Sequence, residues 1–317
     1  MNRRCFIGNA AALWGSLWLG RHAVGGGLAL PPQFKAGAIS DGFSQDFGQA
    51  LHVMKSYGLR WVEIRRVFGV YNTDASPAQI RQIKELVDRY GFRVSVIDSA
   101  LYKCTLPGTT PSTSEKDSYP YAEQMDLLKR ACDRANELGA DKIRIFTFWR
   151  VAHASAVLKR IAAEVQKAVD VAKSHGMRLV IENEESCNVA TGAELRHMLA
   201  EVPASNLGAN WDVGNGYMQG EVSYPDGYDK LDKTRIWHMH LKSMTCQTGL
   251  KECTETIAGQ GLVDLVGQFK ALLRDGYHET MSVECEFSLP GVSQQETAKR
   301  SLDGVIRAMQ KAVGEKS

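Results

Sequence analysis

Eight short segments rich in β-branched and aromatic residues alternate with longer amphipathic segments, and this alternation limits the choice of fold more than any other feature. Between the eight segments, apolar residues recur at spacings of three and four, which is the period of an amphipathic helix. The pattern therefore predicts eight strand-helix units. The predicted strands are residues 34–40, 61–66, 92–99, 142–148, 178–184, 207–214, 236–243 and 280–286.

The helix boundaries carry recognisable signals. Ser76 and Pro77 occupy the cap and first-turn positions of the second helical segment. A glycine closes five helical segments just before the next strand. These glycines are Gly58, Gly91, Gly139, Gly176 and Gly276. Eight units with right-handed connections close on themselves, so we expect one (β/α)8 TIM barrel over residues 30–317. A doubly wound sheet would need a phosphate-binding G-x-G-x-x-G after the first strand, which "GAISDG" does not supply.

The N-terminus resembles a twin-arginine export signal. "MNRRCFIGNAAALWGSLWLG" places two arginines before a moderately apolar stretch, and small residues follow up to Ala29. We therefore expect residues 1–29 to be a signal peptide and the mature protein to be periplasmic or otherwise exported. An N-terminal helix of the fold is the alternative, but the segment lacks caps and precedes a Gly/Pro break.

Charge and hydropathy exclude two classes of partner for the mature chain. The full chain has 38 Lys and Arg against 36 Asp and Glu, and three of the arginines lie in the predicted signal. The mature chain is therefore nearly neutral and has no electrostatic footprint for nucleic acid. It also has no internal run of about 20 apolar residues, so we expect no stable membrane association after cleavage.

Two long connections and two cysteines stand out among the loops. Residues 100–120 follow the third strand and residues 215–230 follow the sixth, so both leave the end of the barrel where active sites are built. We expect them to form substrate walls or lids, with surface decoration as the alternative. Cys246 and Cys253 are close enough in one loop to pair in an oxidising compartment.

Polar residues occupy one face of each of the last four strands. With the two-residue period of a strand, apolar or small residues fall on the opposite face, which would contact the helices. The polar face therefore points into the barrel. Its residues are Glu182 and Glu184, Asn210 and Asp212, His238, His240 and Lys242, and Ser282, Glu284 and Glu286.

Four of these residues are of metal-ligand type and lie at matching depth, late in their strands: Glu182, Asp212, His240 and Glu284. Three carboxylates in a low-dielectric cavity need a counter-charge. One divalent cation would supply it, and the donor set suits Mn²⁺, Mg²⁺, Co²⁺ or Zn²⁺. The alternative is an internal salt-bridge network with Arg65, Arg144 and Lys242.

Four motifs give the chain a family resemblance. "VIENEE", "WDVGN", "HMHLKS" and "SVECE" follow one another on strands five to eight. They resemble the xylose-isomerase-like sugar isomerase and epimerase barrels, a superfamily that includes inosose dehydratases, ketose 3-epimerases and endonuclease IV. The resemblance implies that Glu182, Asp212, His240 and Glu284 hold the metal. It also implies a substrate-oxygen site at the G-x-G-x-x-D loop of residues 257–264, for which a simple tight loop is the alternative. The chain departs from relatives at Asn215 and Ser243, where many have His and Asp.

The resulting hypothesis is a sugar isomerase or epimerase that moves a proton next to a carbonyl through a metal-stabilised enediolate. Glu182 and Glu284 would take and return the proton, Lys242 would polarise a substrate oxygen, and His238 would pack as a core histidine or donate from beneath the site. The partner would be a sugar or keto-sugar, and the sequence leaves a homo-oligomer open.

Other functions use the same scaffold. A lyase or hydrolase of keto-glycosides and an inosose-type dehydratase would need the same metal chemistry, and a non-catalytic sugar-binding barrel would need none of it. An endonuclease IV-type phosphodiesterase is disfavoured, because strands two and three carry Glu63, Arg65 and Asp98 in place of the histidines that its metal cluster needs.

Overall fold

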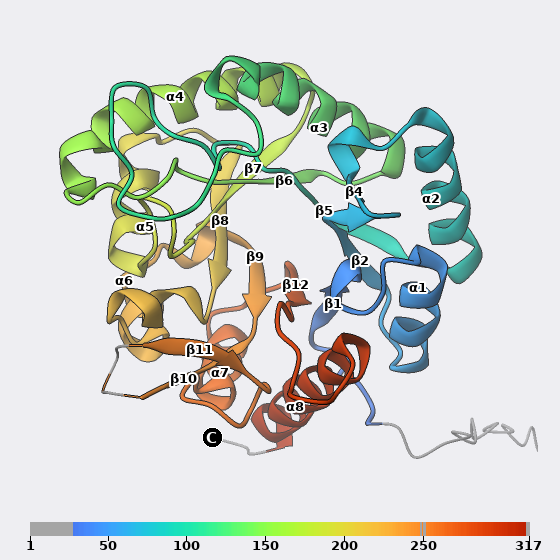
Figure 1. Cartoon of the computed structure of the whole chain (residues 1–317). Coiled ribbons are helices and arrows are strands. Elements are labelled where there is room, and N and C mark those ends of the chain that lie inside the picture. Colours follow the sequence, from blue (N-terminus) through green and yellow to red (C-terminus); the bar gives the residue numbers. More distant parts are fainter. Residues whose placement is uncertain (1–27, 248, 250–251, 315–317) are drawn as a thin grey trace, which may run out of the picture.

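Eight parallel strands form a closed barrel (Figure 1). The computed structural model describes residues 28–247, 249 and 252–314. The strands are β1 Lys35–Ile39, β2 Trp61–Ile64, β5 Arg93–Asp98, β6 Lys142–Ile145, β7 Arg178–Glu182, β8 Leu207–Asp212, β9 Ile236–Leu241 and β12 Thr280–Val283. Around the barrel they follow the order β1, β12, β9, β8, β7, β6, β5 and β2. The predicted (β/α)8 barrel is confirmed, whereas residues 1–27 of the predicted signal lie outside the described residues.

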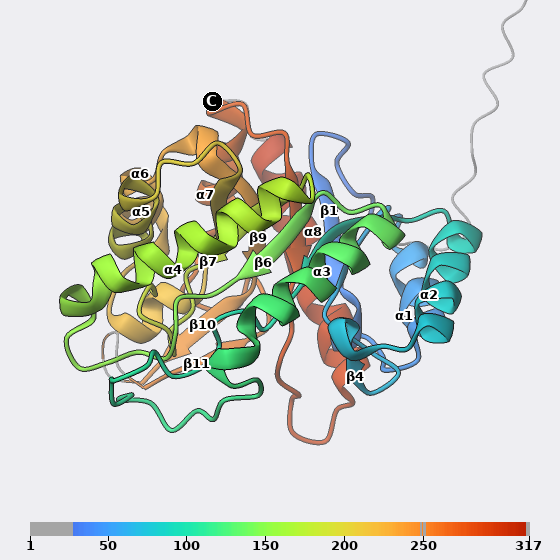
Figure 2. The ribbon, with the colours of Figure 1, turned by 90° about the horizontal axis from the view of Figure 1, so that it is seen from above.

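Helices surround the barrel, one after almost every strand (Figures 1 and 2). They are α1 Phe47–Ser56, α2 Pro77–Tyr90, α3 Gln124–Leu138, α4 Ala154–Ser174, α5 Gly192–Glu201, α7 Leu265–Arg274 and α8 Gln294–Gly314. The connection after β8 differs from the predicted pattern, because it holds only short helical turns and the three-residue α6, Tyr228–Lys230. Three glycines and Pro225 within residues 215–230 account for this, since both residue types interrupt helices.

The predicted helix boundaries are present. Ser76 caps α2 in a reciprocal capping box with Gln79, and Pro77 occupies the first turn. Gly91 follows α2 with a φ of 73°, and Gly139 follows α3 with the same φ, a conformation that a side chain would disfavour. These caps stop each helix where the chain must turn back into the barrel, and so they fix the start of β5 and β6.

The single strand predicted over residues 236–243 ends earlier in the structure, and a hairpin follows it. β9 ends at Leu241, and β10, Ser243–Cys246, then pairs antiparallel with β11, Cys253–Thr256. A disulfide joins Cys246 to Cys253 across this hairpin. Figure 2 shows β10, β11 and the 100–120 loop at the same end of the barrel. Lys242 is the residue at which the chain leaves the barrel wall.

The apolar core fills the layer between the strands and the helices. Leu179, Ile181, Trp211, Met239 and Leu241 are all fully buried there, as the two-residue period predicts for the helix-facing side. The other face of the same strands is left to polar residues inside the barrel. Within the described part of the chain, no helix combines the length and apolarity required to cross a bilayer.

Candidate active site

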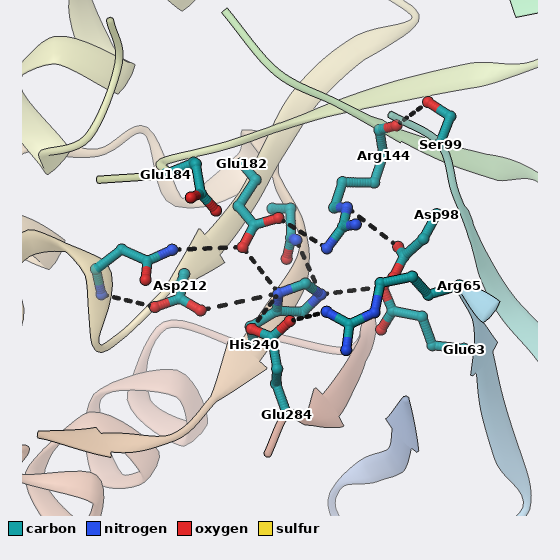
Figure 3. Close-up of polar contacts among 12 residues, drawn as sticks. Glu63, Arg65, Asp98, Ser99, Arg144, Glu182, Glu184, Asp212, His240 and Glu284 are labelled. Carbon is teal, nitrogen blue, oxygen red and sulfur yellow. Dashed lines mark hydrogen bonds and ion pairs between the residues drawn. The ribbon is translucent and has the colours of Figure 1, made fainter. Parts of the chain in front are cut away.

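The four predicted metal ligands converge at the C-terminal end of the barrel (Figure 3). Glu182 is the last residue of β7, Asp212 the last of β8, His240 the fifth of β9, and Glu284 follows β12 directly. All four are buried, and ligand atoms of the four lie within 4.8 Å of one another. The structure thus brings together every residue of the predicted set.

His240 lies at the centre of the three carboxylates. Its Nδ1 is 3.1 Å from Oε1 of Glu182 and 3.3 Å from Oε2 of Glu284. Oδ2 of Asp212 is 3.8 Å from the same nitrogen. One nitrogen and three carboxylate oxygens therefore face a common point, from four strands that the barrel holds in fixed register.

Lys242 binds two of these carboxylates. Its Nζ is 2.8 Å from Oε2 of Glu284 and 3.0 Å from Oδ2 of Asp212. Burial alone would lower the pKa of Lys242, but Asp212 and Glu284 raise it well above its usual value, so the ammonium stays charged. The amide of Asn215 accepts a hydrogen bond from Lys242 at 3.2 Å and donates to Glu182 at 3.4 Å, which places this departure from the family pattern within the site.

Two arginines hold the outer sides of the carboxylates. Arg144, on β6, lies 3.0 Å from Oε2 of Glu182 and 3.3 Å from Oδ1 of Asp98. Arg65, after β2, lies 3.0 Å from Oε1 of Glu284 and also pairs with Asp41. The salt-bridge network that the sequence offered as an alternative to a metal is therefore present.

The positive groups of this network are fewer than its buried carboxyl groups, and this excess of acid favours the binding of a cation. Four positive groups, of Arg65, Arg144, Lys242 and the protonated His240, face six buried carboxyl groups, which leaves an excess of two acids. These carboxyl groups belong to Asp41, Glu63, Asp98, Glu182, Asp212 and Glu284. Oε2 of Glu182, Oδ2 of Asp212 and Oε2 of Glu284 are buried without a hydrogen bond among the described residues. Their contacts are ion pairs with Arg144, Lys242 and His240. The donor set and the excess charge therefore fit a divalent metal ion.

The pKa values of the site residues are also those expected where carboxyl groups outnumber positive groups. Burial raises the pKa of Asp212 to about 7, and the neighbouring Glu284 and Glu182 add to the rise that Lys242 opposes. For Glu182, burial is outweighed by His240 and Arg144, which lower its pKa to about 2. The carboxylates likewise raise the pKa of His240 well above its usual value despite burial. A divalent cation would favour the charged form of Asp212 and the neutral form of His240.

Sequence reasoning did not assign Glu63, which lies directly behind His240. Its Oε1 is 3.0 Å from His240 Nε2, and its Oε2 is 2.8 Å from His238 Nε2. The signal in the sequence was a single glutamate between two apolar residues in the second strand, which identifies no partner. His238, expected to pack or to donate from below, makes a specific hydrogen bond with this carboxylate.

The G-x-G-x-x-D segment forms a tight loop against the hairpin. Asp264 caps α7 by accepting a hydrogen bond from the Gly267 amide at 2.8 Å. A Cβ at Gly261 would lie 2.3 Å from the carbonyl oxygen of Met244, so the close approach requires glycine. These contacts account for the motif structurally, and its predicted role in holding a substrate oxygen stays a prediction.

The sequence matches one protein-family model and resembles several curated enzymes. A family model described as xylose isomerase-like TIM barrel matches residues 51–309. Inosose dehydratase of Serratia proteamaculans (strain 568) is 28% identical over 148 residues, which cover 40% of this chain and 47% of that enzyme. The chain thus spans about half the length of the curated relatives that it matches.

Solved structures with the same fold cover nearly the whole chain. The crystal structure of the IOLI protein with a bound zinc atom has a TM-score of 0.70 and 15% identity, and the match covers 88% of this chain and 99% of that one. The 3-keto-D-glucoside 4-epimerase YcjR from E. coli gives a TM-score of 0.63 and 14% identity, with 86% and 99% covered. At these identities the likeness concerns the fold.

Proposed function

The chain belongs to the xylose isomerase-like TIM barrel family, and on this premise we propose that it is a divalent-metal-dependent sugar isomerase or epimerase. The reaction is proton transfer next to a carbonyl group. The observation that carries this proposal is the pair of buried carboxylates, Glu182 and Glu284, that reach the same nitrogen of His240 from two strands that are not neighbours.

Glu182 and Glu284 are in the ionised form that a proton acceptor requires. Burial opposes ionisation, but Lys242 and His240 hold the pKa of Glu284 well below its usual value, and that of Glu182 is about 2. Both are therefore ionised at neutral pH. Arg144 and Arg65 fix their outer oxygens, so each carboxylate keeps its orientation while a substrate binds.

The residues that would hold the cation are Glu182, Asp212, His240 and Glu284, and the set suits Mn²⁺, Mg²⁺, Co²⁺ or Zn²⁺. When bound, the cation polarises a substrate carbonyl and stabilises the negative charge left after proton removal. Return of the proton to the opposite face of the same carbon gives epimerisation, and return to the adjacent carbon gives isomerisation. The ammonium group of Lys242, which lies 2.8 Å from Oε2 of Glu284, would donate a hydrogen bond to a substrate oxygen.

Elimination is the second candidate reaction. It starts with the same proton removal and ends with loss of a β-hydroxyl or a glycosidic oxygen, as an inosose-type dehydratase or a keto-glycoside lyase would require. The similarity to inosose dehydratases over about half their length favours it.

Deuterium exchange tests the proposal and separates its outcomes. The metal-loaded protein is incubated in D₂O with ketoses, inososes and 3-keto-glycosides, and the sugars are followed by NMR. Deuterium next to a carbonyl would support proton transfer, with a new stereocentre for epimerisation, a moved carbonyl for isomerisation and a new double bond for dehydration. If no sugar exchanges while calorimetry shows the cation bound, the proposal is wrong.

We also propose export through the twin-arginine route. The arginine pair before the apolar N-terminal stretch supports it, as does the Cys246–Cys253 disulfide, which suits an oxidising compartment. Replacing Arg3 and Arg4 with lysine should leave the precursor in the cytoplasm, as shown by fractionation and by the mass of the mature chain. Equal export of the lysine variant would contradict this route.

A further inference from the structure

A continuous series of buried hydrogen bonds runs from His240 away from the metal ligands, and Figure 3 shows its first contact, between His240 and Glu63. His240 Nε2 is 3.0 Å from Oε1 of Glu63, and the other oxygen of Glu63 is 2.8 Å from His238 Nε2. His238 Nδ1 is in turn 2.8 Å from the hydroxyl oxygen of Thr280. These four residues come from β9, β2 and β12, and none is more than 2% exposed.

The two ring nitrogens of His240 have different surroundings. Nδ1 faces Glu182 and Glu284, whereas Nε2 faces Glu63. An ionised carboxylate only accepts hydrogen bonds, so the Glu63 contact requires the proton on Nε2. Nδ1 is protonated as well while it faces only the ionised Glu182 and Glu284, so a bound cation would replace the Nδ1 proton and Nε2 would keep its own. The Asn210 amide, 3.0 Å from Nε2, can present its oxygen to the same N–H after a half-turn of its side chain.

Glu63 is itself held by the rest of the series. Each of its oxygens has one imidazole N–H as partner, and the Thr280 hydroxyl can donate to Nδ1 of His238 so that the His238 proton lies on the nitrogen facing Glu63. The three contacts are therefore consistent with one arrangement of protons. Changing any member alters the tautomer that the next one favours.

We propose that Glu63 is a positioning residue that fixes the tautomer and ring orientation of His240 for binding a divalent cation, and that His238 and Thr280 hold Glu63 in place. The inference rests on the proposed metal site but not on the reaction. It is also distinct from a second metal site at Glu63, His238 and His240, whose ligand atoms are close enough for an ion. In that cluster both Glu63 oxygens and the ring nitrogens that face them have hydrogen-bond partners, whereas Oε2 of Glu182, Oδ2 of Asp212 and Oε2 of Glu284 have ion pairs but no hydrogen bond.

Glu63→Gln is the decisive variant, because it keeps the shape but leaves one acceptor and one donor facing two imidazoles. We expect the Kd for Zn²⁺ or Mn²⁺, measured by calorimetry on the full chain, to rise by about 10- to 100-fold. Thr280→Val, farther along the series, should raise it less, and Glu63→Asp should recover part of the affinity. Glu279→Gln serves as the matched control at the opposite end of the barrel, where it pairs with Lys142 and Arg178, and should leave the Kd unchanged.

Imidazole NMR gives a second readout that needs no variant. In ¹⁵N-histidine-labelled metal-loaded protein, His240 should carry its proton on Nε2 and show the shift of a metal-bound Nδ1. A proton on Nδ1, or a wild-type Kd in Glu63→Gln, would overturn the proposal. Two equivalents of bound metal, with one lost in Glu63→Gln, would instead identify a second metal site. Weaker cation binding in Glu63→Gln without deuterium exchange in any sugar would leave this inference standing and remove the proposed reaction.

Discussion

The ammonium group of Lys242 lies 2.8 Å from Oε2 of Glu284, the same oxygen that faces Nδ1 of His240 at 3.3 Å. Lys242 therefore shares a proposed metal-binding oxygen with the histidine. It also lies 3.0 Å from Oδ2 of Asp212. A divalent cation and this ammonium would compete for the same negative charge, and this competition gives the first prediction.

Lys242→Met should make the thermal stability of the protein depend more strongly on bound metal. Without Lys242, Asp212 and Glu284 lose a buried partner, and breaking such a pair costs about 3–5 kcal/mol. We expect a lower melting temperature in EDTA and a larger rise on adding Mn²⁺ or Zn²⁺ than in the wild type, measured by scanning calorimetry. Lys129→Met, at an exposed ion pair with Asp126, is the control and should change neither value. An equal metal-induced rise in Lys242→Met and the wild type would contradict the competition.

The second prediction separates proton transfer from metal binding. Glu284→Gln and Glu182→Gln should each slow deuterium exchange by about 10²- to 10⁴-fold even at saturating metal, because the amide cannot accept the proton. Asp212→Asn should weaken metal binding but recover exchange when metal is saturating. Exchange rates by NMR, with metal content measured in parallel, make the comparison. Wild-type exchange in Glu284→Gln would exclude its proton-transfer role.

The strand pattern made the ligand set predictable, because the two-residue period assigns a face to each residue and strand ends assign its depth. Glu182 and His240 could therefore be placed together from the sequence. Glu63 could not be placed with them from the sequence. Its partners His238 and His240 lie on β9, which is far from β2 in the chain, and the strand pattern does not tell which residues meet inside the barrel. Arg65 and Arg144 were recognised as cations, but no local pattern tells which carboxylates they contact.

The hairpin shows a second limit of the sequence. Ser243 continues the alternation of β9, so the pattern gives no sign that the barrel strand ends at Leu241 and that a new strand begins. Cys253 was recognised as a partner for Cys246, yet the strand around it is too short and polar to be predicted. Only the pairing of β10 with β11 defines it.

The third prediction concerns pH and Glu255, on β11. Burial raises the pKa of Glu255 to about 8, although Lys242 opposes the rise. The folded state thus binds a proton that the unfolded state releases above its ordinary pKa of about 4.3. This contribution to stability is present at low pH and is lost as the pH rises towards 8. Glu255→Gln should therefore gain stability over the wild type by up to about 4 kcal/mol at pH 9 relative to pH 5, because the window from pH 5 to the folded pKa of about 8 spans three pH units.

Urea unfolding in EDTA at the two pH values measures this difference. Glu115→Gln, at an exposed position of the 100–120 loop, is the matched control and should follow the wild type at both. The same wild-type-to-variant difference at pH 5 and pH 9 would show that Glu255 is not protonated in the folded protein.

The fourth prediction tests the close packing of α8 against the segment that leads into α7. A Cβ on Gly304 would lie 1.8 Å from the carbonyl oxygen of Ala258, so alanine there must push the helix or the backbone aside. Overpacking of this kind costs about 1–3 kcal/mol or more. We expect Gly304→Ala to lower the free energy of unfolding by at least that amount, measured by urea denaturation.

Gly314, in the same helix, provides the control, because a Cβ there meets nothing within 4 Å. Gly314→Ala should be neutral or stabilise by up to about 1 kcal/mol, since alanine favours the helix. The opposite signs distinguish a steric effect at one position from a general effect of helix propensity along α8. If both variants were stabilised, Gly304 would not be in close contact with Ala258, and α8 would lie farther from the barrel end than the structure places it.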